Sequence, residues 1–250
     1  MVFFLNRSKP STLSASIDTV LPENQDNVVL KSNTRAKRLT LRFDVHKNLF
    51  TLTTPPRTSS QKIHDFLTKS STWMEKQSLK KLSPIAFEPG LILSILGTEK
   101  TLIHDPHFIA RSVVETESEI IVQAPLNRFS YHVKMHLKKR AKDLFTTWCD
   151  EYCANLPRSI FKKPKITSIT IKDTKSRWGS CSSMGTISLS WRLILAPEAV
   201  AKYVCLHECC HLVEMNHSNA FWHLVHDQDP EFNAHKKWLK DHGNKLFCYG

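Results

Sequence analysis

Three histidines and one glutamate near the C-terminal end of the chain have the types and spacing of a metal-dependent hydrolytic site. They lie in HECCHLVEMNH, residues 207 to 217. On an α-helix each residue advances about 100°, so His207 and His211 would lie about 40° apart and could bind one ion. Glu208 would lie beside His207, close enough to act as a general base on a water molecule without being a ligand. The spacing therefore predicts a zinc site with Glu208 as its base.

His217 is the candidate for the third ligand, and its position requires the helix to end before it. Six more helical residues would place it about 240° from His211, on the opposite side of the helix. Asn216 enters the left-handed conformation at low cost, and Ser218 can cap a following helix. We therefore expect a turn at Asn216 that returns His217 to the ion.

A second group of candidate residues lies upstream in SRWGSC, residues 176 to 181. Arg177 is a fixed positive charge that could hold a carboxylate or phosphate, contact an oxyanion, or form a structural ion pair. Cys181 has no evident basic partner, which favours a packed thiol over a nucleophile. Trp178 and Trp191 are expected to pack in the core. Arg177 is therefore the second candidate catalytic residue, with a structural role as its alternative.

The composition is typical of a globular protein that does not span a membrane. The chain has 250 residues, of which 41% are hydrophobic and 23% charged, and no stretch approaches the roughly 20 apolar residues of a membrane helix. The opening MVFFLNRSKPS lacks a basic segment and a cleavage site, so we expect a cytoplasmic location. The odd number of cysteines favours free thiols over a disulfide framework. We expect one of Cys209 and Cys210 to pack inward and neither to bind metal.

The net charge of +12 indicates acidic partners. Basic residues gather in KMHLKKRAK, residues 134 to 142, and in FKKPK, residues 161 to 165. This pattern predicts either a solvated helix face or a surface for an anionic nucleotide or nucleic acid. The oligomeric state is left open by the sequence.

The periodicity of apolar residues divides the chain near Pro125. Residues 1 to 27 have a polar composition without a period and are expected to form a loose leader. Residues 28 to 125 contain a β-hairpin around VHKN, a helix from about 60 to 82, and further strands at about 91–96, 100–104, 108–115 and 119–124. This half is predicted to be a β-rich subdomain with one long helix.

The second half, residues 126 to 250, is led by helices. An amphipathic helix is expected over about 129 to 155, followed by strands in KITSITIKD and GTISLSWRLIL. Pro197 at the first helical position should begin the helix that carries the histidines, and Ser218 and Pro230 should begin two more before a loose end at Gly243. We predict an α+β fold in which the β-rich half packs on a helical half with a small sheet.

The motifs SRWGSCSS, LSWRLILAP and HECCHLVEMNHS, with FW at 221–222, resemble the YgjP-like metallopeptidase-domain family. This family is zincin-like and related to the SprT and WLM groups. The resemblance extends upstream to RAKRLTLRF, TTPP and Trp73. It implies that His207, His211 and His217 bind zinc, that Glu208 is the catalytic glutamate, and that the second half is zincin-like. It names no physiological substrate.

We therefore expect a zinc-dependent hydrolase of metallopeptidase type that acts on peptides or proteins. One alternative is a metal-dependent nucleotide (phosphoanhydride) hydrolase, which the basic residues would favour. Another is a nucleic-acid-associated adaptor with a degenerate metal site.

Overall fold

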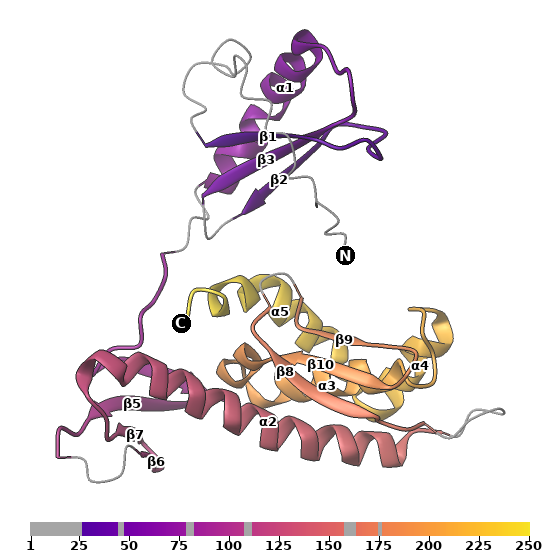
Figure 1. Ribbon diagram of the computed structural model, residues 1–250. Helices are drawn as coiled ribbons and strands as arrows, with labels where there is room; N and C mark the ends of the chain where they lie inside the picture. Colours follow the sequence, from indigo (N-terminus) through magenta and orange to yellow (C-terminus); the bar gives the residue numbers. More distant parts are fainter. Residues whose placement is uncertain (1–26, 45–47, 79–82, 108–111, 158–163, 175–176) are drawn as a thin grey trace, which may run out of the picture. The chain divides into compact units, whose positions relative to one another are not determined.

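The computed structural model describes residues 27–44, 48–78, 83–107, 112–157, 164–174 and 177–250. The chain divides into two compact units, Met1–Ser83 and Pro84–Gly250. Within the described residues the fold is mixed α+β, as predicted, with five α-helices and three small sheets (Figure 1). None of these helices is long and apolar enough to cross a membrane. The expected leader lies outside the described residues apart from Asn27.

The first unit contains a three-stranded sheet and one helix. Its elements are β1 (Val28–Ser32), β2 (Thr40–Asp44), β3 (Leu49–Thr54) and α1 (Ser60–Ser78). β3 is the central strand, antiparallel to β2 and parallel to β1, which confirms the predicted hairpin. Alternate residues of β3, Phe50 and Leu52, are buried against Leu67 of α1. The alternate side chains of β3 therefore help to form a small core within the first unit.

The second unit begins with a four-stranded sheet that packs on a long helix. The strands are β4 (Ile92–Ile95), β5 (Thr98–His104), β6 (Val113–Glu115) and β7 (Glu119–Val122), in the order β4-β5-β7-β6. A short 3₁₀ turn, η1 (Leu126–Arg128), leads into α2 (Phe129–Asn155), which has the bounds that the apolar period predicted. Leu102 and Ile120 of the sheet share one core with Val133 of α2.

This packing places the boundary between the units at Ser83 and Pro84, whereas the sequence pattern suggested a boundary near Pro125. The buried residues of the strands between residues 92 and 122 belong to the same core as those of α2. The first unit has a separate core. The change from strand to helix periodicity at Pro125 therefore marks a change of element within one unit.

A three-stranded sheet, called the second sheet because it is the second in this unit, and three helices complete the unit. They are β8 (Ser168–Lys172), β9 (Gly179–Cys181), β10 (Thr186–Ser190), α3 (Glu198–Cys210), α4 (Asn219–Gln228) and α5 (Phe232–Leu246). β10 is the central strand, parallel to β8 and antiparallel to β9. In Figure 1, α2 runs alongside this sheet as well as the four-stranded sheet of the same unit.

Three local predictions in this region need correction. The expected strand through WRLIL ends at Ser190, and the buried residues that follow form a 3₁₀ helix, η2 (Trp191–Leu195). Pro197 is the N-cap of α3 and not its first residue. Gly243 does not end the last helix, because it lies within α5, where a Cβ atom would come within 2.9 Å of the Trp178 ring. Close packing against Trp178, and not a helix stop, explains this glycine.

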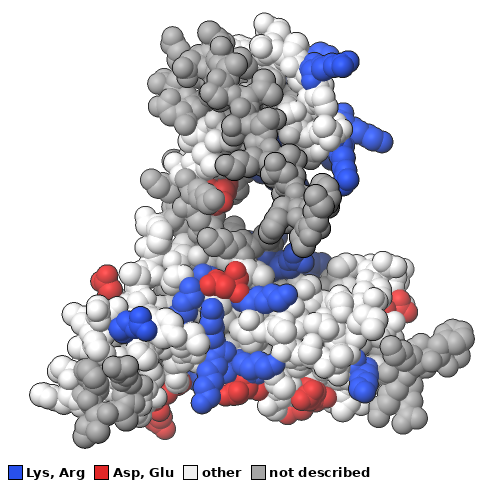
Figure 2. Space-filling view, viewed as in Figure 1, with Lys and Arg blue, Asp and Glu red and all other residues white. Residues whose placement is uncertain are grey.

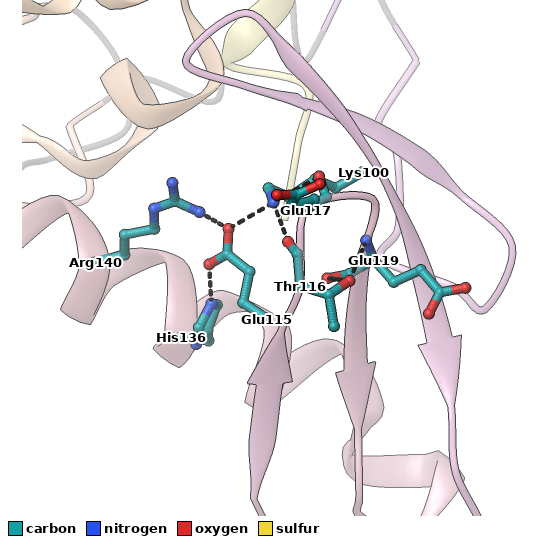
Figure 3. A network of polar contacts seen from close by, with 7 residues as sticks. All are labelled: Lys100, Glu115, Thr116, Glu117, Glu119, His136 and Arg140. Carbon is teal, nitrogen blue, oxygen red and sulfur yellow. Dashed lines mark hydrogen bonds and ion pairs between the residues drawn. The ribbon is translucent and has the colours of Figure 1, made fainter.

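The basic segment of α2 is largely occupied by contacts within the protein. Arg140 and His136 both contact the carboxylate of Glu115, which also lies 3.2 Å from Nζ of Lys100 (Figure 3). Lys134 and Lys138 contact Asp173, and Lys142 donates to the carbonyl oxygen of Ile169. On the face drawn in Figure 2, Lys and Arg side chains are interspersed with Asp and Glu side chains. These contacts favour the structural interpretation of the segment; Lys162 and Lys163 lie outside the described residues.

Replacing Glu115 with glutamine should destabilise the second unit. The Lys100 side chain is 7% exposed, and the substitution would leave its charge buried beside that of Arg140 without the carboxylate that now contacts both. We expect the free energy of unfolding to fall by about 3 kcal/mol, the lower end of the range for breaking a buried ion pair. Denaturant unfolding would measure it. Glu99→Gln is the matched control, since Glu99 precedes Lys100 on the same strand, is exposed and has no ion pair among the described residues. Equal losses in both variants would contradict a role for the Glu115 carboxylate.

Candidate metal centre

The helix that carries two of the three histidines is packed on nearly all sides. Within α3, Val200, Val204, Cys205 and Leu206 are buried, and the helix contacts α2, α4, α5 and the second sheet. A helix that is apolar all round is typical of a core position. The last turn of α3 is therefore held by the core, and it carries His207 on a rigid support.

His207, His211 and His217 come together as the spacing predicted. One ring nitrogen from each lies within 4.8 Å of those of the other two. The ring centroids are 5.0 Å apart for His207 and His211, 4.9 Å for His207 and His217, and 4.8 Å for His211 and His217. Within the described part of the chain, this is the group of side chains whose geometry could hold a metal ion.

The turn that returns His217 to the other histidines differs from the predicted one. α3 ends at Cys210, with His211 as its C-cap, so the helix does stop before His217. The amides of Val213 and Glu214 both donate to the carbonyl oxygen of Cys210. Asn216 does not adopt a positive φ, so the left-handed turn predicted there is wrong. The amide of Ser218 instead donates to the carbonyl of Asn216, and the Ser218 hydroxyl accepts from the amide of Phe221 to cap α4, as expected.

The pKa values of His207 and His211 favour neutral rings, which suits a cation. Burial, followed by the neighbouring charges of His211 and His217, lowers the pKa of His207 to about 3, and burial also lowers the pKa of His211. Nδ1 of His211 lies 2.9 Å from the carbonyl oxygen of Glu214, which leaves its Nε2 with a free lone pair. Nε2 of His217 is 3.0 Å from Nε2 of His207. Three imidazoles that converge in this way form a donor set of the kind that zinc binds.

Two aromatic residues at the start of α4 form a wall behind the histidines. Phe221 is fully buried and stacks on His211 with ring centroids 4.5 Å apart. Trp222 stacks on His217 at 5.6 Å. These contacts restrict the orientation of both rings. In the sequence the FW pair contributed only to the family resemblance; its place in the first turn of the helix that Ser218 caps was the signal that could have located it.

Glu208 points away from solvent toward β9. Its side chain is buried, with 6% of the residue exposed. Burial, together with the charge of Cys149, raises its pKa to about 7, while the charge of Arg177 acts in the opposite direction. A Cβ atom on Gly179 would lie 2.5 Å from Oε1 of Glu208 and 2.6 Å from its Cγ. The φ angle of Gly179 is not positive, so the space for Glu208, and not the backbone, requires glycine there.

Gly179→Ala should therefore both destabilise the protein and displace Glu208. Overpacking of this kind typically costs about 1–3 kcal/mol, which thermal unfolding would detect as a lower Tm. The same substitution in a Glu208→Ala background should cost much less, because the atoms that it would meet are gone. This double-mutant cycle measures the contact between the two residues without any assay of activity. If Gly179→Ala lowers the Tm by the same amount in both backgrounds, the backbone of β9 and not Glu208 limits the space.

The other candidate residues lie outside the histidine group. Arg177 is exposed and lies beside a cavity on the second sheet, outside the histidine group. Burial, with the charges of Glu208 and Cys149, raises the pKa of Cys181 to about 11, which supports a packed thiol over a nucleophile. Trp191 is fully buried and Trp178 stacks on Phe247.

The cysteines next to the histidines belong to the core. Cys209 and Cys210 are both fully buried, so the expectation that only one would pack inward is wrong. Sγ of Cys209 lies 3.5 Å from the carbonyl oxygen of Cys149 in α2. The almost uniform burial of α3 leaves no solvent-facing side for either residue. These thiols therefore help to pack α3 on α2.

The chain is similar to a known family of proteins. The family model described as YgjP-like, metallopeptidase domain, matches residues 37–242. Among solved structures, the crystal structure of the metallopeptidase zymogen of Pyrococcus abyssi abylysin aligns at 20% identity with a TM-score of 0.32, covering 41% of this chain and 95% of that chain. No curated protein gives a significant match.

Proposed function

Since the chain belongs to the YgjP-like metallopeptidase-domain family, we propose that it is a zinc-dependent hydrolase of metallopeptidase type. His207, His211 and His217 would hold the ion, and Glu208 would be the general base. The observation that carries this proposal is the convergence of three imidazole nitrogens within 4.8 Å of one another at the end of the helix that bears Glu208.

The roles of the residues follow from their positions. A zinc ion bound by the three histidines would supply Lewis acidity and lower the pKa of a coordinated water. Glu208 would accept a proton from the attacking water and return it to the amine of the leaving group. Gly179 leaves the space that lets the Glu208 carboxylate lie against β9. The Phe221 and Trp222 rings would keep His211 and His217 oriented toward the ion.

A peptide or protein is the proposed substrate, in keeping with the family. The two alternatives, a nucleotide hydrolase and a nucleic-acid-associated adaptor, drew their support from the basic segment of residues 134–142. Four cations of that segment, Lys134, Lys138, Arg140 and Lys142, have partners within the protein, which weakens both. A cytoplasmic location is also part of the proposal, because reducing conditions there would keep the seven free cysteines as thiols.

Side-by-side assays of casein and of nucleoside triphosphates test the proposal. The zinc-loaded protein should release peptides from casein and leave the triphosphates intact. Turnover of triphosphates alone would replace the peptidase assignment with a phosphoanhydride hydrolase. Steeply salt-dependent DNA binding without any turnover would instead favour the adaptor.

A further inference from the structure

The second sheet has a small polar cavity on the face opposite Glu208. Side chains two residues apart on a strand share a face, as do directly paired residues on neighbouring strands. Ser188 and Ser190 of β10 therefore share a face with their partners Ser180 of β9 and Lys172 of β8. These four residues line a cavity of about 120 Å³ together with Thr174, Arg177, Trp178 and Gly179.

Two cations at this cavity have no ion-pair partner among the described residues. Neither Lys172 nor Arg177 forms an ion pair there, in contrast to the cations of the basic segment. Asp173, the carboxylate next to Lys172 in the chain, already contacts Arg192, Lys134 and Lys138. The hydroxyl of Thr174 donates to the carbonyl of Arg177 at 2.7 Å, which holds the backbone of Arg177 beside the cavity. Positive charge is thus held at the cavity without a carboxylate in contact with it among the described side chains.

A buried hydroxyl at the same cavity also lacks a partner. Ser190 is 1% exposed, and its Oγ has no hydrogen-bond partner among the described residues. The neighbouring Ser188 hydroxyl, by comparison, lies 2.8 Å from Oγ1 of Thr170. An unpaired buried hydroxyl is costly, and most such groups are found to be bonded to protein, water or ligand. Ser190 therefore supplies a hydrogen-bond donor beside two unpaired cations.

We propose that this cavity binds the oxyanion of a small ligand group, a carboxylate or a phosphate, through Arg177, Lys172 and the Ser190 hydroxyl. Arg177 would form charge-assisted hydrogen bonds to the oxyanion, for which a guanidinium is well suited. The volume is well below the roughly 300–1,000 Å³ of sites that enclose a drug-sized molecule. The cavity therefore takes one terminal or side-chain group and not a whole nucleotide.

The site lies next to the candidate metal centre without being part of it. β9 lies between them: Gly179 meets Glu208 and also lines the cavity, whereas Ser180 lines the cavity alone. Binding at the cavity does not require hydrolysis. Anion binding at the cavity can therefore be tested independently of the proposed function.

Titration of the ¹⁵N-labelled protein as purified tests the inference directly. Inorganic phosphate and N-acetylglycine would be added in separate series at constant ionic strength, maintained with sodium chloride, while backbone amide shifts are followed by NMR. We expect saturable shifts with one site per chain, centred on Gly179, Ser180 and Ser190. Arg177→Gln and Lys172→Gln should each weaken binding by about tenfold, the usual scale for a hydrogen bond to a charged group. Ser190→Ala should weaken it less.

Two control variants distinguish binding at the cavity from binding elsewhere on the protein. Lys139→Gln removes the same charge from an exposed position on α2, so it should leave the affinity unchanged. His217→Ala should also leave the affinity unchanged, which would show that the anion does not bind through the metal centre. The inference is overturned if no saturable shift appears, if Lys139→Gln weakens binding as much as Arg177→Gln, or if His217→Ala abolishes binding. Tighter binding of N-acetylglycine would identify a carboxylate, such as a peptide C-terminus, as the source; tighter binding of phosphate would identify a phosphate group.

Discussion

Glu208→Gln should reduce hydrolysis by roughly 10²-fold or more while leaving the zinc content and the Tm nearly unchanged. Glutamine keeps the size and hydrogen-bonding reach of the side chain but cannot accept the proton of an attacking water. A fall of this size is the usual scale for the loss of a positioned acid-base group. Because the carboxylate is buried and Gly179 leaves just enough room for it, the isosteric amide should fit the same space. Steady-state kinetics on casein, with zinc analysis and thermal unfolding of the same samples, would measure all three quantities.

The matched control for this variant is Glu198→Gln, at the exposed start of the same helix, where Glu198 pairs with Lys202. It makes the same chemical change outside the site and should keep full activity. Loss of zinc from the Glu208→Gln variant would indicate that Glu208 is a zinc ligand. Normal turnover would assign the role of base to another group.

His217→Ala and His207→Ala should each lose most of a zinc content of about one ion per chain. Removal of one imidazole leaves two protein ligands where a zinc site normally has at least three. His217 provides the cleaner test, because its side chain is exposed and its loss should cost the fold little. His207 is partly buried beneath Phe221 and Trp222, so its variant should also have a lower Tm. Elemental analysis after dialysis would give the zinc content.

His223→Ala is the matched control for the histidine variants. His223 is exposed on α4 and lies outside the histidine group, so its loss should leave zinc in place. Cys209→Ser and Cys210→Ser should also retain zinc, although both thiols are buried and their loss should lower the Tm. Zinc that survives the loss of His217 would refute the three-histidine assignment. Zinc lost from either cysteine variant would indicate a thiolate ligand.

Local patterns in the sequence were sufficient for the elements and for the histidine group. The apolar period of residues 129 to 155 predicted α2, the alternation around VHKN predicted the β2–β3 hairpin, and Ser218 marked the start of α4. The positions of His207 and His211 follow from the pitch of one helix, and the return of His217 requires only that the helix stop. These features depend on residues within a few positions of one another, which is the range over which helix pitch, strand alternation and capping act.

Contacts between distant residues were decided by the tertiary structure alone. Gly179 approaches Glu208 across 29 positions, and no local period records that a glycine in one strand must leave room for a carboxylate on a later helix. The cations of residues 134–142 appeared free in the sequence, yet four of them have partners on β6, near β8 or in β8. The unit boundary moved for the same reason, because the strands before Pro125 bury their apolar faces against α2. Burial and ion pairing depend on which surfaces meet in three dimensions, and periodicity along the chain describes only the face that each element offers.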